Sequence, residues 1–85
     1  MNYYVYILLA KNSNISYVGY TNNIKKRISL HNKGRGAKFT RGRKWKLIYK
    51  YKCMSKSDAM KKEIYLKKNF LIRKKIKNNY LKKIK

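Results

Sequence analysis

Two apolar runs near the start of the chain decide the fold, Tyr3-Tyr-Val-Tyr-Ile-Leu-Leu9 and Ser16-Tyr-Val-Gly-Tyr20. Their β-branched, aromatic and aliphatic residues are typical of strands. The polar segment Lys11–Asn14 between them contains Asn-Ser-Asn, which favours a turn. We therefore expect the two runs to pair as a hairpin.

Two tyrosines are expected to meet on one face of this hairpin. Successive strand residues point to opposite faces, which puts Tyr6 and Tyr17 on the same side. Gly19 would have a structural role there, because it leaves space beside the rings or lets a backbone approach closely. With nine tyrosines in the chain, ordinary strand tyrosines remain an alternative interpretation.

The rest of the chain predicts a helix, a loop, a strand and two further helices. Their expected ranges are Ile24–His31, residues 32–44, Trp45–Lys52, Ser55 to about Phe70, and Ile72 to the end. Ser55-x-x-Asp58 has the form of a capping box. The pattern predicts an α/β (α+β) fold, a small three-stranded antiparallel sheet flanked by helices in the order β-β-α-β-α-α. We expect one domain over residues 1–85, with a core at 3–70 and a basic C-terminal helix at 72–85.

Charge is the most unusual feature of the composition. The 85 residues include 25 Lys or Arg and two Asp or Glu, which gives a net charge of +23. Such a chain repels itself, and an anionic partner such as nucleic acid would relieve that repulsion. A genome rich in A and T would also raise the Lys content, but it would not remove Asp and Glu.

Several classes of protein are disfavoured. The apolar run Tyr3–Ala10 is far shorter than the roughly 18 residues of a membrane span, and its flanks do not fit a signal peptide. Cys53 is the single cysteine and there is one histidine, which argues against a disulfide framework and a structural zinc site. We expect a cytoplasmic protein, at the nucleoid when bound to DNA, with no membrane partner and no small-molecule cofactor.

The loop at residues 32–44 is the expected nucleic-acid contact. It combines three glycines with six basic residues. Together with one lysine of the following helix, the candidate nucleic-acid-binding residues are Lys33, Arg35, Lys38, Arg41, Arg43, Lys44 and Lys67.

Polar residues fall on the apolar side of the first predicted helix. On a helical wheel, Arg27 and His31 lie between Leu30 and the pair Ile24 and Ile28. Being four residues apart, they are neighbours on the helix surface. Either they belong to a site, or Arg27 extends along the rim and His31 is a satisfied core histidine.

The next helix repeats this pattern with Glu63 and Lys67. Both fall within an arc otherwise formed by apolar residues, namely Ala59, Met60, Ile64, Leu66 and Phe70. A pair between Glu63 and Lys67 is one explanation. The other is a divalent cation, since Mg²⁺ often takes one carboxylate from protein and its remaining ligands from water and phosphate. With Arg27 and His31, this carboxylate suggests phosphodiester chemistry.

Five segments, taken in order, resemble the GIY-YIG nuclease superfamily. They are Tyr4-Val5-Tyr6, Tyr17-Val18-Gly19, Asn23 to His31, Gly36 to Gly42 and Ser55 to Glu63. The match covers residues 3 to about 70 and most resembles the small, stand-alone, bacterial-type members. Tyr4 stands where the family signature has glycine. Other relatives carry extra DNA-recognition domains, and we expect none here, so targeting would come from the basic loop, the last helix or a protein partner.

The resemblance implies a role for each matching residue. Glu63 would hold one Mg²⁺ or Mn²⁺, and Tyr6 or Tyr17 would help to deprotonate or orient the attacking water. Arg27 would stabilise the charge that develops on phosphate, and His31 would assist proton transfer or bind the scissile group.

The leading hypothesis is therefore a metal-dependent endonuclease that hydrolyses DNA phosphodiester bonds, structure-specific or non-specific, in DNA repair or recombination. The alternative is a non-catalytic module that binds DNA or RNA and retains the nuclease fold. A basic ribosome-associated or RNA-binding protein and membrane association of the last helix are further alternatives. RNA binding would be seen as a preference for RNA over DNA of equal length.

Overall fold

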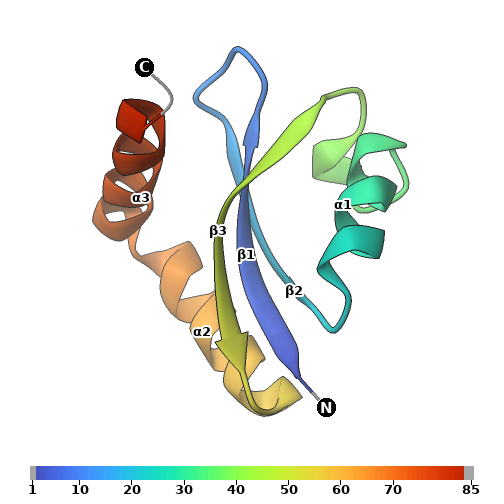
Figure 1. Ribbon diagram of the computed structural model, residues 1–85, viewed down its shortest axis with the longest axis vertical. Coiled ribbons are helices and arrows are strands. Elements are labelled where there is room, and N and C mark those ends of the chain that lie inside the picture. The colour runs from blue at the N-terminus through green and yellow to red at the C-terminus, as the bar shows by residue number, and fades with distance from the viewer. Residues whose placement is uncertain (1, 84–85) are drawn as a thin grey trace.

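The centre of the molecule is strand β1, Tyr3–Ala10, in which residues 5–10 are all buried. The computed structural model describes residues 2–83. β1 pairs antiparallel with β2, Ser16–Thr21, on one side and with β3, Trp45–Cys53, on the other. The strand order is β2-β1-β3, so β2 and β3 are the edges (Figure 1). The predicted hairpin and the predicted element order are confirmed.

Helices cover both faces of this sheet. α1, Ile24–Asn32, lies on one face, while α2, Lys56–Lys68, and α3, Phe70–Lys83, lie on the other (Figure 1). A strand covered on both sides needs apolar side chains at every position, which explains the uninterrupted run in β1.

The core is accordingly divided into two thin clusters. The cluster under α2 and α3 contains Val5, Ile7, Val18, Cys53, Ala59 and Leu66. The cluster under α1 contains Tyr6, Leu8, Ala10 and Trp45, with Tyr17 packed against it. Tyr6 and Tyr17 therefore share the α1 face, as the hairpin predicted.

Side-chain caps fix the helix starts. The Asn23 side chain accepts a hydrogen bond from the Lys26 amide at 3.1 Å, and Ser55 Oγ accepts one from the Asp58 amide at 3.1 Å. Each cap satisfies one amide that the first turn leaves without a helical partner. The predicted start at Ser55 is confirmed.

Two boundaries differ from the prediction by more than one residue. α2 ends at Lys68, and the next helix begins at Phe70 rather than at Ile72. The reason is Asn69, whose side-chain oxygen accepts a hydrogen bond from the Ile72 amide at 3.3 Å and so starts a new helix. Positions 84 and 85 of the predicted C-terminal helix lie outside the described residues. The loop after α1 contains a short 3₁₀ turn, η1, Lys38–Thr40.

The apolar arc predicted for α2 is wider than the buried stripe. Ala59 and Leu66 are buried, but Met60, Ile64 and Phe70 are exposed. α2 contacts the sheet along one narrow line, so helical periodicity alone overestimates what it covers. Within residues 2–83, no helix combines the length and apolarity needed to cross a membrane.

Candidate active site

A polar cleft of about 410 Å³ lies beside the edge strand β2, between α1 and α2. Side chains from both faces of the sheet reach it. Its lining residues are Tyr3, Tyr6, Tyr17, Gly19, Tyr20, Thr21, Asn22, Arg27, Lys56 and Glu63. Four of the five predicted catalytic residues therefore meet in one cavity, and the fifth, His31, lies buried behind it.

Gly19 allows Tyr6 to reach this cleft from the central strand. The two residues are directly paired across β1 and β2. A Cβ atom at position 19 would come within 2.5 Å of the Tyr6 hydroxyl and 3.1 Å of the Tyr17 ring. No side chain fits there, so the phenol of Tyr6 lies over the bare backbone of the edge strand. The structural role predicted for Gly19 agrees with this geometry.

The imidazole of His31 is hydrogen-bonded to the hydroxyl groups of Tyr6 and Thr40. Tyr6 Oη lies 2.8 Å from His31 Nε2, and Thr40 Oγ1 lies 2.9 Å from His31 Nδ1. Thr40 Oγ1 donates its only proton to the carbonyl of Ala37 at 2.9 Å. It can therefore only accept from His31, which assigns the proton to Nδ1 and leaves Nε2 to accept from Tyr6.

The result is a directed hydrogen-bond chain from Tyr6 through His31 and Thr40 to Ala37. Tyr6, His31 and Thr40 are all buried. The interpretation of His31 as a satisfied core histidine agrees with this burial and with its two partners, while its role in a site stays a prediction. Its ring is buried, and its one accepting nitrogen points at a hydroxyl that lines the cleft.

Further contacts hold the loop between α1 and β3 against these hydrogen-bonded residues. Arg27 Nη2 donates to the Gly36 carbonyl at 3.0 Å, and Trp45 Nε1 donates to the Thr40 carbonyl at 2.9 Å. Gly36 packs so closely on the imidazole that a Cβ atom there would overlap His31. Gly19 and Gly36 are therefore needed for the same reason: a side chain at either position would collide with the Tyr6 phenol or the His31 imidazole.

Burial sets the protonation of the two central groups. It lowers the pKa of His31 below its usual value, and the nearby Arg27 charge acts in the same direction. Burial raises the pKa of the Tyr6 hydroxyl, against the opposing effect of Arg27. At neutral pH the resting pair is thus a neutral phenol donating to a neutral imidazole.

Arg27 is placed to receive an anion. Its contact with the Tyr6 hydroxyl raises the guanidinium pKa, so the side chain stays charged. Its Nε is buried and has no hydrogen-bond partner within residues 2–83. A buried donor of this kind is costly unless a ligand atom satisfies it, and a phosphate oxygen is well suited to a guanidinium.

Glu63 supplies the carboxylate of the cleft. Its side chain is 17% exposed, and it pairs with Lys67 at 3.4 Å. Residues 2–83 contain no cluster of three or more His, Cys, Asp or Glu that could hold a metal. One carboxylate still fits Mg²⁺ or Mn²⁺, because these ions accept water and substrate phosphate as their other ligands. Lys67 is 52% exposed, which leaves its long side chain free to move away.

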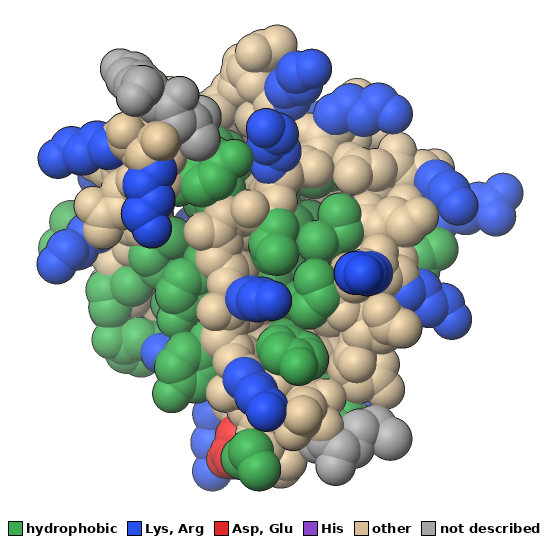
Figure 2. All heavy atoms as spheres, viewed as in Figure 1, with side chains coloured by type: hydrophobic (Ala, Val, Ile, Leu, Met, Phe, Trp, Pro, Cys, Tyr) green, Lys and Arg blue, Asp and Glu red, His purple; other side chains and the backbone are tan. Residues whose placement is uncertain are grey.

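The predicted basic residues lie on the surface. Those of the loop are all exposed, namely Lys33, Arg35, Lys38, Arg41, Arg43 and Lys44. Figure 2 shows Lys and Arg side chains along the upper left, top and right of one face and over its middle, while acidic atoms are visible only near its lower edge.

Thr40, Phe39 and Lys56 were not predicted from the sequence. Thr40 and Phe39 lie in an irregular loop, where no periodicity indicates which side chains turn inward. Lys56 is one of many lysines, and only the fold shows that it lines the cleft. The motif Phe39-Thr40 within the matching segment Gly36 to Gly42 was the available signal.

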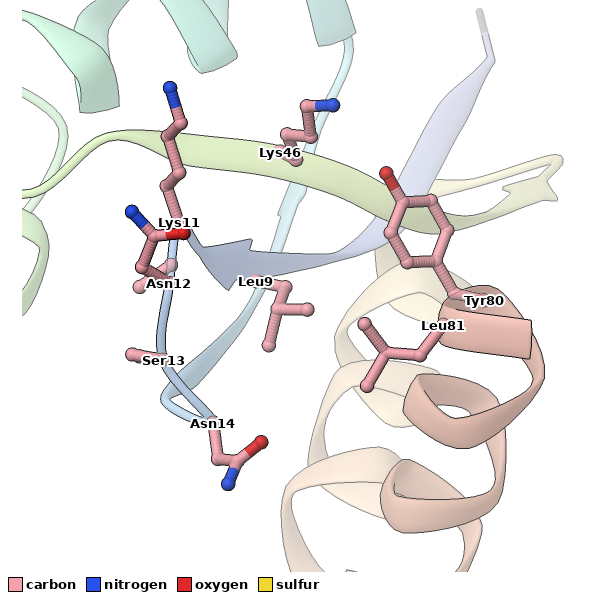
Figure 3. A pocket seen from close by; sticks show the side chains of 9 residues that line it. Leu9, Lys11, Asn12, Ser13, Asn14, Lys46, Tyr80 and Leu81 are labelled. Atoms are coloured by element: carbon pink, nitrogen blue, oxygen red, sulfur yellow. The ribbon is translucent and has the colours of Figure 1, made fainter. Parts of the chain in front are cut away.

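A second cleft, of about 500 Å³, lies at the other end of β1. Tyr80 and Leu81 of α3 face Leu9 across it, and the β1–β2 turn forms one wall (Figure 3). Among its lining residues within 2–83 there is no carboxylate, histidine or arginine. The cleft at β2 is therefore the better candidate for chemistry.

Fold and cleft together define a class of protein, a small basic α+β protein whose site suits a phosphate group. The chain belongs to the GIY-YIG family, because residues 2–80 match the model described as the GIY-YIG catalytic domain. The resemblance predicted from the sequence is confirmed.

Individual relatives agree with this assignment. The chain is 57% identical over 47 residues to the UPF0213 protein CPE1444 of Clostridium perfringens, covering 54% of this chain and 50% of that protein. It is 51% identical over 41 residues to the UPF0213 protein OB0043 of Oceanobacillus iheyensis, covering 48% and 46%. The matches thus span about half the length of these curated relatives.

A solved structure shares the fold. The solution NMR structure of the UPF0213 protein BH0048 from Bacillus halodurans matches with a TM-score of 0.53 and 41% identity. The match covers 88% of this chain and 80% of that one.

We expect His31 to make stability depend on pH. The unfolded histidine binds a proton below about pH 6.5, while the folded one stays neutral to lower pH. The unfolded state then binds more protons, so the free energy of unfolding falls as pH falls below about 6.5, by at most about 1.4 kcal/mol per pH unit. Urea unfolding of wild type and His31→Gln between about pH 7.5 and pH 5 measures this slope.

The slope should be present in wild type and absent in His31→Gln. Lys33→Gln, an exposed change on the adjacent loop, is the control and should retain the slope. Equal slopes in wild type and His31→Gln would contradict the assignment of a buried neutral imidazole.

Proposed function

We propose that this protein is a metal-dependent endonuclease that hydrolyses DNA phosphodiester bonds. The observation that carries the proposal is the hydrogen bond from Tyr6 to His31. Tyr6 lines the same cleft as Arg27 and Glu63. A proton acceptor, an anion-binding cation and a carboxylate are the groups that phosphodiester hydrolysis needs. Membership of the GIY-YIG family supports the same reaction.

Tyr6 transmits the proton in this mechanism. A water molecule attacks the phosphorus atom, a new P–O bond forms, and the bond to the leaving oxygen breaks. The proton of the water moves to Tyr6 Oη as the phenolic proton moves to His31 Nε2, across 2.8 Å. The leaving oxygen takes a proton from solvent, and His31 later releases its proton to solvent through Tyr6. The lowered pKa of His31 keeps Nε2 free to accept at neutral pH.

Arg27 and Tyr17 act on the phosphate group. The unpartnered Nε of Arg27 would donate to a phosphate oxygen and stabilise the negative charge that grows in the transition state. Tyr17 lines the same cleft and lies beside His31, with ring centroids 5.0 Å apart, so it would help to orient the attacking water.

Glu63 would hold one Mg²⁺ or Mn²⁺. When bound, the ion would neutralise charge on the phosphate and on the leaving oxygen. Lys67 would leave Glu63 and turn toward the DNA backbone, which fits its predicted role as a nucleic-acid contact.

The net charge of +23 supports nucleic acid as substrate. The exposed basic loop after α1 would bind backbone phosphates without reading sequence. Cutting is then set by DNA structure rather than by sequence, and repair or recombination are processes in which such cutting would be used.

One observation favours the alternative of a binding module without activity. Lys67 pairs with Glu63 at 3.4 Å and competes with a cation for the carboxylate. A chain in which this pair persists on DNA would bind nucleic acid, DNA or RNA, and would not cut it.

We expect Glu63→Gln to reduce cleavage by about 100-fold or more, because it removes the negative ligand of the cation. Binding should survive, since the basic loop is unchanged. The measurement is cleavage of supercoiled plasmid, single strands, flaps, four-way junctions and RNA with Mg²⁺ or Mn²⁺. Asp58→Asn is the matched control, because it removes the other carboxylate of the chain at an exposed helix start.

The outcomes separate the two functions. Cutting by wild type and Asp58→Asn but not by Glu63→Gln supports the endonuclease. Tight binding with no cutting of any substrate would favour the binding module. Equal cutting by all three proteins would identify a contaminating nuclease.

We expect Tyr6→Phe and Tyr17→Phe to differ in their pH profiles. The wild-type rate should fall as acid protonates His31, below its usual pKa of about 6.5. Tyr6→Phe disconnects His31 from the water, so the rate should fall by about 100-fold and the acid limb should vanish. Tyr17→Phe should lower the rate and keep the acid limb. Loss of the limb in Tyr17→Phe alone would assign proton transfer to Tyr17 instead.

A further inference from the structure

Phe39 is an exposed aromatic residue next to the candidate active site. Its side chain is 56% exposed, although phenylalanine is usually buried. Its ring stacks on Tyr17, with centroids 6.2 Å apart and an interplanar angle of 24°. Trp45 supports it from behind, with centroids 6.3 Å apart. Phe39 is thus the outer member of an aromatic stack that begins inside the cleft.

The turn that carries Phe39 is held in place. Phe39 lies in η1, between Lys38 and the buried Thr40. Thr40 is fixed by four hydrogen bonds: its amide and hydroxyl donate to Ala37, its hydroxyl oxygen accepts from His31, and its carbonyl accepts from Trp45. The ring is therefore presented on a rigid support, and little side-chain or loop entropy is lost when a ligand binds to it.

Two basic residues lie close to Phe39 in the sequence. Lys38 directly precedes it, Arg41 follows two residues later, and both are exposed. An aromatic ring bordered by Lys and Arg matches a nucleotide, in which a flat base alternates with an anionic phosphate. An apolar protein partner would not match these charges.

We propose that Phe39 is a stacking platform for one unpaired base, so that the preferred substrate is DNA with an unpaired nucleotide beside the scissile phosphate. In a duplex, both faces of an internal base are covered by its neighbours. Only a single strand, a flap or a flipped nucleotide can offer a free face to Phe39. The position of that nucleotide rests on the proposed function, in which the scissile phosphate lies between Arg27 and Glu63.

The first test measures binding without any divalent cation, so that it does not depend on cleavage. The probes are a DNA single strand carrying 2-aminopurine and the same strand in a fully paired duplex. Phe39→Ala should weaken single-strand binding by about 10- to 100-fold and duplex binding by less than about 2-fold. The 2-aminopurine emission that wild type quenches on binding should recover in this variant.

Matched variants separate stacking from fold and from general apolarity. Phe39→Trp should retain tight single-strand binding, and Phe39→Leu should lose it although it stays apolar. Leu71→Ala is the surface control, since Leu71 is 75% exposed on α3 and should have no effect. Thermal unfolding of each variant shows whether the fold is retained. If Phe39→Ala is destabilised, the test uses the difference in binding between Phe39→Trp and Phe39→Leu instead.

Three results obtained without cleavage would overturn the inference. They are equal weakening of single-strand and duplex binding by Phe39→Ala, full binding by Phe39→Leu, and a dimer in wild type that Phe39→Ala dissolves, which would mean that a second copy covers the ring. Stacking without any cleavage would refute the proposed function and leave this inference standing. Cleavage of paired and unpaired DNA at equal rates, unaffected by Phe39→Ala, would support the proposed function and refute this inference.

Discussion

The buried hydrogen bond between Tyr6 and His31 is the contact on which the rest of the site depends. The imidazole of His31 is fully buried, and leaving a buried polar group unsatisfied costs about 1–3 kcal/mol. Gly19 and Gly36 leave room for the phenol and the imidazole, and Thr40 fixes which nitrogen of the ring carries the proton. The same contact thus orders the edge strand, the first helix and the loop that follows it.

The net charge of the chain constrains where its basic residues can lie. The charge is +23, and the two core clusters are thin, so apolar packing provides little cohesion to oppose the repulsion between like charges. Most basic residues are exposed on loops and helices, where water and counterions screen them. Arg27 and Arg73 are partly buried, and the Nε of each is unpartnered within residues 2–83. Of these two, Arg27 lines the cleft at β2, so together with Glu63 it gives the surface a place where a phosphate group would be held rather than merely attracted.

Periodic elements made most of the fold and half of the site predictable. Arg27 and His31 could be found because a helix has a repeat against which a misplaced polar residue is visible, and Glu63 because carboxylates are so scarce here. Thr40 and Phe39 could not be found in this way, because a loop has no repeat. The apolar arc of α2 was overestimated since Met60 and Ile64 are exposed. The break at Asn69 was missed by a residue or two, because a cap depends on side-chain geometry that composition does not encode.

The most direct test of this account is the tautomer of His31, read from the nitrogen chemical shifts of the imidazole near neutral pH. The chain has one histidine, so the signals need no separation from others. The directed hydrogen-bond chain requires a neutral ring with its proton on Nδ1 and an Nε2 that accepts from Tyr6. Replacing Thr40 by Val should loosen this preference. A ring protonated on Nε2, or a charged imidazolium at neutral pH, would contradict the directed chain and the mechanism built on it.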